Sequence, residues 1–261
     1  WEAAALLAPQ AVAPPLASFD LALAARETGR AQNALEHLTA LLGANHFEVA
    51  MRRAQLAMLQ RDWPTADAAL QTAQQAHPQD QSVPLLRADL LRARGEYSAA
   101  QKLLLEILQS GAPQPSTLVA AAEMLAAMSD AKEASALAAA LPQANQWQHL
   151  ARALLSLRAG ENTPAPELKS PLAQAALAQG YARAGRDEAA LQLWREAGEN
   201  GTRELRSLAA LHAMTLTARN GAAETSLQQY RALASPVASE TEQQRARDVL
   251  LEAWRKNFRQ D

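Results

Sequence analysis

The chain has 261 residues, of which 25 are basic and 27 acidic, giving a formal net charge of −2, and none is cysteine. The lack of cysteine excludes disulfides, thiolate metal sites and cysteine nucleophiles, and the interleaved charges leave no single-sign field that would attract nucleic acid or an anionic membrane. Alanine, leucine, glutamine and arginine dominate while aromatic residues make up only 4%, a balance that predicts an almost entirely helical protein.

The opening of the chain is apolar but interrupted. Pro9, Pro14, Pro15 and Asp20 break the run, and no stretch approaches the roughly 18 uninterrupted apolar residues that a membrane span needs. We therefore expect no transmembrane segment. Because the sequence begins at Trp1 without a methionine, we expect a processed form or an excised segment, from which a targeting peptide or anchor can have been cleaved.

Four helical hairpins are predicted next, over residues 19–42, 47–78, 81–112 and 116–141. Small residues recur in them every 34 positions: Ala54, Ala88 and Ala122, and again Ala66, Ala100 and Ala134. Bulky residues such as Trp63 and Tyr97 keep the same register. We expect the alanines to let the two helices of a hairpin approach closely, and large side chains such as Tyr97 and Leu104 to fill the space between hairpins.

This period of 34 residues resembles the helix-turn-helix unit of the tetratricopeptide repeat family. The best-matching unit carries its small, turn, bulky and proline positions in the family's order: Ala54, Arg61-Asp62, Trp63, Ala66, Leu70, Ala73 and Pro78. A later unit repeats that order with Tyr181, Gly185, Ala190, Trp194 and Ala197. The resemblance implies an all-α, right-handed solenoid of about six such hairpins, whose first helices line a concave binding surface.

The repeat register breaks in the middle of the chain. Residues 147–158 are predicted to form a first helix without its partner, because Pro164 and Pro166 disfavour helix in the segment 161–170 that follows. We therefore divide the chain into an array of about four hairpins, an orphan helix with a proline-containing joint, about two further hairpins and a closing helix, at residues 1–142, 143–169, 170–238 and 239–261.

The closing helix is predicted over about Glu240 to Phe258. Leu250, Trp254 and Phe258 recur every four residues beside charged neighbours, which gives the helix one apolar stripe. We expect this stripe to cap the last hairpin, since terminal repeats need a cover. Docking of a partner on the same helix is the alternative.

No pattern in the chain predicts catalysis. The histidines are scattered and show no metal-binding spacing: His37, His46, His77, His149 and His212. Gly180 and Gly185 have phosphate-loop spacing, but Arg186 and Asp187 follow where lysine and a hydroxyl residue are required, and no strand is predicted before them. A left-handed turn residue at Gly185 explains the glycine better. We expect no enzymatic activity, no metal and no cofactor.

Carried over to matching positions, the resemblance implies a groove that binds a partner through the first helices. Its expected residues are Leu23, Arg26, Gln55, Met58, Leu59, Asp89, Arg92, Glu123, Gln179, Arg183, Thr215 and Arg219. This surface is mixed and lacks the basic and asparagine cluster with which some family members clamp a C-terminal carboxylate. Arg183 and Arg219 stand nearly one repeat apart, so they form either a short positive strip or two separate solvated arginines.

Three functions fit these features. The first is a non-catalytic scaffold or adaptor that binds a protein or peptide segment of unknown identity. The second is a helical-repeat module of an envelope machine for polysaccharide export or cell-wall synthesis, which touches a glycan as well as proteins. The third is the superhelical part of a larger lytic transglycosylase-like enzyme. The use of arginine over lysine and the high alanine content favour a bacterial protein of the periplasm or envelope, and nucleic acid is not expected as a partner.

Overall fold

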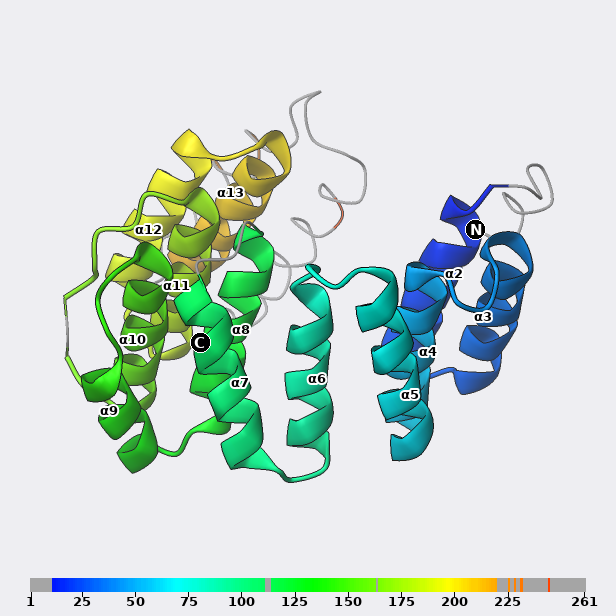
Figure 1. The fold of residues 1–261 in the computed structure, drawn as a ribbon. Helices are drawn as coiled ribbons and strands as arrows, with labels where there is room; N and C mark the ends of the chain where they lie inside the picture. Colours follow the sequence, from blue (N-terminus) through cyan, green and yellow to red (C-terminus); the bar gives the residue numbers. More distant parts are fainter. Residues whose placement is uncertain are drawn as a thin grey trace, which may run out of the picture. The chain divides into compact units, whose positions relative to one another are not determined.

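The computed structural model describes residues 11–110, 114–162 and 164–219, together with Thr225, Gln228, Arg231 and Gln244. Within these residues the regular secondary structure is helical throughout, and no helix is both long and apolar enough to cross a membrane. The chain separates into two compact units, residues 1–110 and 111–261. Figure 1 shows the ribbon of each unit, and the two are described separately below.

The first unit contains three successive helical hairpins. They are formed by α2 (Ala13–Ala24) with α3 (Thr28–Leu42), α4 (Phe47–Gln60) with α5 (Trp63–Ala76), and α6 (Ser82–Ala93) with α7 (Tyr97–Ser110). The two helices of each pair pack together, and each hairpin packs on the next through α3 with α4 and α5 with α6. The first helices also touch in order, α2 with α4 and α4 with α6.

The second unit does not consist of consecutive hairpins throughout. Its described helices are α8 (Pro115–Met128), α9 (Ala131–Ala140), α10 (Gln146–Arg158), α11 (Pro171–Arg183), α12 (Asp187–Asn200) and α13 (Arg203–Arg219). Helix α10 packs against α8, α9 and α11, whereas α8 and α9 scarcely contact each other, so the hairpin predicted over residues 116–141 is not formed. Helix α12 packs against both α11 and α13. The prediction of an all-α fold in which neighbouring helices pack as in a helical-repeat solenoid is confirmed.

Local sequence signals set where the helices begin and end. The side chain of Asn145 caps α10 by accepting from the backbone N–H groups of Trp147 and Gln148, at 3.0 and 2.9 Å. Gly95 and Gly185 take positive φ angles of 83° and 73° in the turns before α7 and α12, as a left-handed turn residue should. The left-handed conformation predicted for Gly185 is therefore confirmed.

The alanines of the 34-residue period all lie in the interior of the protein. All six have no exposed surface: Ala54, Ala66, Ala88, Ala100, Ala122 and Ala134, each at 0%. An alanine in such a position lets two helix axes come close, whereas any larger side chain would push them apart. The period seen in the sequence therefore marks buried helix positions, and the close approach of the two helices of a hairpin at these alanines stays a prediction.

Tyr97 departs from its predicted role. We expected it to fill the space between hairpins, but its side chain is 54% exposed. Its helix, α7, is the last of the first unit, so no further helix of that unit is available to cover it. The equivalent Trp63 lies on α5 in the middle of the unit and packs against the buried cluster around Leu70.

The proline-containing joint is confirmed as a non-helical segment. No helix is assigned between the end of α10 at Arg158 and Pro171, in the part of this stretch that the structure describes. The joint lies inside the second compact unit. The finer division at residues 142, 169 and 238 stays a prediction, and the capping helix expected at 239–261 lies outside the described residues apart from the single position Gln244.

Candidate functional site

The first helices of the second unit enclose a hollow of about 390 Å³. It lies where α8, α10 and α11 pack against one another. We call it the first-helix hollow, and its main lining residues are Glu123 on α8, Leu154, Leu157 and Arg158 on α10, and Gly180 and Arg183 on α11. Three helices separated in the sequence thus contribute to one surface.

The floor of the first-helix hollow is apolar and tightly built. A Cβ atom at Gly180 would lie 2.7 Å from Cδ2 of Leu154 and 3.2 Å from Cδ1 of Leu157. Glycine inside a helix costs about 1 kcal/mol relative to alanine, so its presence there is best explained by this close approach of α11 to the leucines. The glycine leaves space for the two leucine side chains against α11, and we call these two lining side chains the leucine floor of the hollow.

Charged groups flank this floor. Glu123 is half-buried, and burial raises the pKa of its carboxyl group, while the nearby positive charge of Arg183 opposes that rise. The Nη2 atom of Arg183 donates to Oε1 of Gln179 at 3.4 Å, and Nε of Arg158 donates to the carbonyl oxygen of Ser129 at 3.0 Å. These bonds occupy only part of each guanidinium group, which has five N–H donors.

The first-helix hollow brings together some of the residues predicted from the sequence. Glu123 and Arg183 both line it, and Gln179 accepts a hydrogen bond from Arg183. Thr215 lies on α13, where its hydroxyl group donates to the carbonyl oxygen of Leu211 at 2.8 Å, and it does not line the hollow. Arg219 ends α13 and its side chain lies outside the described residues, so the strip formed with Arg183 stays a prediction.

The groove residues predicted in the first unit lie on α2, α4 and α6 or in the turn after α2. Asp89 and Arg92 pair with each other on α6, with Nε of Arg92 donating to Oδ1 of Asp89 at 2.9 Å. Leu23 and Met58 pack against buried clusters of the unit, and Leu59 is half-buried. On α4, Gln55 has a buried Oε1 without a hydrogen-bond partner among the described residues.

Arg26 is not on a helix face, contrary to the prediction. It follows α2 in the turn before α3 and has a left-handed backbone with φ of 58°. Because α2 ends at Ala24, Arg26 takes the turn position that Gly95 and Gly185 occupy in other hairpins.

The sequence reasoning missed the contribution of α10 to the first-helix hollow. Leu154, Leu157 and Arg158 lie three and four residues apart and therefore share one helix face. This spacing is visible in the sequence, but the prediction of an orphan helix left α10 out of the groove. Packing between α8 and α11 makes it the central helix of the hollow.

Histidine and carboxylate groups do not gather elsewhere into a metal-like cluster: in the described part of the chain, no group of three or more such ligands is present. His212 instead stacks on Trp194 between α13 and α12, with ring centroids 4.4 Å apart and planes inclined by 8°. Burial lowers the pKa of this imidazole.

No protein-family model matches the chain, and a search of curated proteins gives no match either.

Proposed function

We propose that the chain is a non-catalytic scaffold or adaptor that holds a segment of a partner polypeptide in the first-helix hollow of its second unit. The observation that carries this proposal is the combination of the leucine floor with the flanking charges of Glu123, Arg158 and Arg183. An apolar floor with a few converging polar groups is the usual composition of a site that binds a ligand side chain.

The lining residues indicate what the bound segment contains. Leu154 and Leu157 accept an aliphatic side chain, whose burial supplies most of the binding free energy. Arg158 and Arg183 provide donors for a carboxylate or for backbone carbonyl groups of the segment, and Glu123 accepts from backbone N–H groups. A short segment with one aliphatic residue beside one acidic residue fits this arrangement.

Two features support an adaptor. Helices positioned by buried alanines form a stiff platform, so little conformational entropy is lost when a partner binds. The resemblance of the sequence to tetratricopeptide repeats points the same way, because arrays of stacked hairpins present extended surfaces to partners.

A peptide-display selection on the purified chain tests the proposal. We expect enriched peptides to combine an aliphatic residue with a neighbouring Asp or Glu. Arg183→Glu places a second carboxylate near Glu123 and should abolish their binding, whereas Arg195→Glu makes the same change of charge at an exposed position of α12 that does not line the hollow and should leave it intact. No enrichment, or equal recovery by both variants, would contradict the proposal.

The exchanged pair Glu123→Lys with Arg183→Glu sharpens this test. It reverses the order of charges across the hollow while keeping the leucine floor. The double variant keeps the net charge of the hollow, because Arg158 is unchanged, and should select peptides in which the acidic residue lies on the other side of the aliphatic residue. If it keeps the original peptides, the charges do not face the bound segment.

A further inference from the structure

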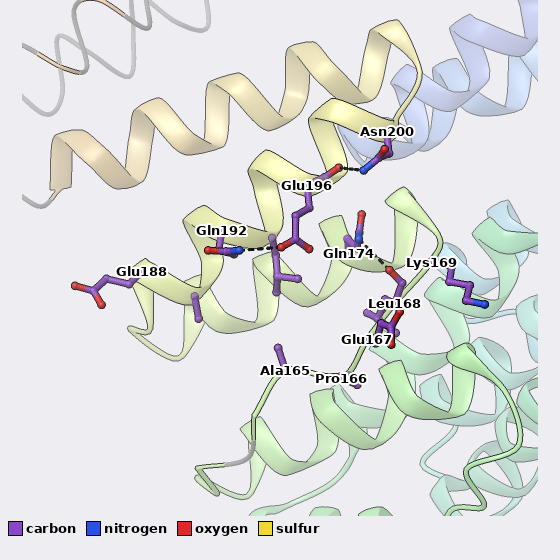
Figure 2. A pocket seen from close by; sticks show the side chains of 12 residues that line it. Ala165, Pro166, Glu167, Leu168, Lys169, Gln174, Glu188, Gln192, Glu196 and Asn200 are labelled. Carbon is purple, nitrogen blue, oxygen red and sulfur yellow. Dashed lines mark hydrogen bonds between the residues drawn. The ribbon is translucent and has the colours of Figure 1, made fainter.

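A second hollow, of about 910 Å³, lies between the extended segment Ala165–Lys169 and α12. We call it the α12 hollow, and Figure 2 shows its lining side chains coming from the extended segment on one side and from α12 on the other. Its other polar lining residue, Gln174, lies on α11. None of its lining residues belongs to the first-helix hollow.

The α12 hollow follows from the missing second helix after α10. An extended chain advances about 3.3 Å per residue, whereas a helix advances 1.5 Å. A ten-residue extended segment can therefore run back along α10 and is much thinner than a second helix would be. The space that the thicker helix would fill is left open beside α12. The joint predicted from the prolines therefore shapes one wall of the hollow.

This wall is held at both ends. The N–H groups of Lys169 and Ser170 donate to Oε1 of Gln146 at 3.1 and 2.9 Å, next to the start of α10. At the other end, the carboxylate of Glu161 accepts from the hydroxyl groups of Ser135 and Ser156, at 2.5 and 2.9 Å. The hollow is thus bordered by a fixed segment.

The opposite wall is a polar stripe on α12. Glu188, Gln192, Glu196 and Asn200 are spaced by four residues, which puts them on one helix face. Nε2 of Gln192 donates to Oε1 of Glu196, and Nδ2 of Asn200 donates to the carbonyl oxygen of Glu196, both at 3.0 Å. Each amide nitrogen uses one of its two N–H groups in this way, and with the four carboxylate oxygens of Glu188 and Glu196 this wall carries more acceptors than donors.

Gln174 adds an acceptor that the protein itself does not use. Its residue is 8% exposed, and its Nε2 donates to the carbonyl oxygen of Leu168 at 2.9 Å. Its Oε1 is buried and has no hydrogen-bond partner among the described residues. Figure 2 shows this oxygen directed away from Leu168 and toward α12. A buried acceptor without a donor is unfavourable, so a ligand that supplies an N–H there gains free energy.

The charges that line the α12 hollow determine which hydrogen-bond donors of a ligand it favours. Glu167, Glu188 and Glu196 line it with Lys169 as the one basic residue among them, a formal charge of −2 from three carboxylates and one ammonium group. We propose that the α12 hollow binds a basic segment of a partner polypeptide, whose arginine or lysine side chains donate to Glu188, Glu196 and Gln174.

Arginine suits this site best. Its planar guanidinium group pairs with a carboxylate through two parallel hydrogen bonds and has further N–H groups for an amide oxygen. A neutral glycan would leave the negative charge of the hollow uncompensated. The volume exceeds that of one side chain, which favours a segment with several residues over an isolated amine.

Fluorescence anisotropy on the full chain tests this proposal with a labelled Ala-Arg-Ala-Arg-Ala peptide. We expect saturable binding that weakens as salt is raised, and at least tenfold weaker binding of the matching glutamate peptide. The double variant Glu188→Gln with Glu196→Gln should raise the Kd at least tenfold, because each lost charge-assisted hydrogen bond accounts for about that factor. Glu199→Gln, on the exposed side of α12 outside the hollow, should leave the Kd unchanged.

Two further variants separate the α12 hollow from the first-helix hollow and from attraction by charge alone. Gln174→Met removes the unpartnered oxygen with little change of volume and should weaken the arginine peptide, with circular dichroism confirming the helical fold. Arg183→Glu in the first-helix hollow should not change this Kd, so either proposal can fail without the other. Equal affinity of the double variant and the parent, or binding of spermidine or chitotriose without binding of the arginine peptide, would overturn the proposal.

Discussion

Replacing a buried repeat alanine tests how the helices are held together. Ala100 lies on α7, has no exposed surface and belongs to the alanine series spaced by 34 residues. Leucine at this position adds three carbon atoms to a side chain that has no exposed surface. Such overpacking costs about 1–3 kcal/mol, since the burial gained by the added carbons is offset by displaced neighbours.

The neighbouring Ala99 provides a matched control on the same helix. It is exposed, and leucine and alanine have similar helix propensities, so Ala99→Leu should change the free energy of unfolding by less than about 0.5 kcal/mol. Urea denaturation followed by circular dichroism measures both variants, and hydrogen exchange with mass spectrometry localises the loss to residues 82–110. If Ala100→Leu is as stable as Ala99→Leu, the alanine period does not mark the tight helix contacts.

Three other perturbations have defined outcomes. Leu104→Ala removes a fully buried side chain and should lower the free energy of unfolding by about 2–5 kcal/mol in urea titrations. Asn145→Ala removes the cap of α10 and should cost about 1 kcal/mol, with faster amide exchange at the start of that helix as the diagnostic. Burial lowers the pKa of His212 below its usual 6.5, so the unfolded chain takes up the proton first and stability should fall as the pH drops below about 6.5. His212→Phe keeps a ring against Trp194 and should flatten this pH dependence, and an unchanged urea midpoint of the parent chain between pH 8 and pH 5 would contradict it.

The sequence predicts most of the helical framework because the framework depends on short-range patterns. Alanines at a fixed spacing, prolines in one segment and a turn glycine such as Gly185 act within a single hairpin or turn. The structure bears these out through the complete burial of the alanines and the left-handed turn. The exposure of Tyr97 does not follow from these patterns, because no single repeat encodes how many hairpins a compact unit contains.

The hollows are less accessible to sequence reasoning because each depends on how distant segments pack. The sequence predicts Glu123 and Arg183 as members of one long groove, yet their proximity depends on how α8, α10 and α11 pack against one another. The α12 hollow was not predicted at all. Its acceptors are ordinary surface residues in the sequence, and only the return path of the extended segment shows that they enclose a space with the buried oxygen of Gln174.

The turns of the first unit differ in whether glycine or a residue with a side chain fills the left-handed position. Arg26 and Arg61 adopt φ angles of 58° and 60°, where the turn before α7 uses Gly95. A side chain with a Cβ crowds the following carbonyl oxygen in this conformation, at a cost of about 1–2 kcal/mol, and asparagine tolerates it better than arginine. Asparagine at either position would relieve this crowding in the folded protein. Unlike glycine, it would not make the unfolded chain more flexible. Substitution at these two turns is therefore a way to raise the thermal stability of the protein.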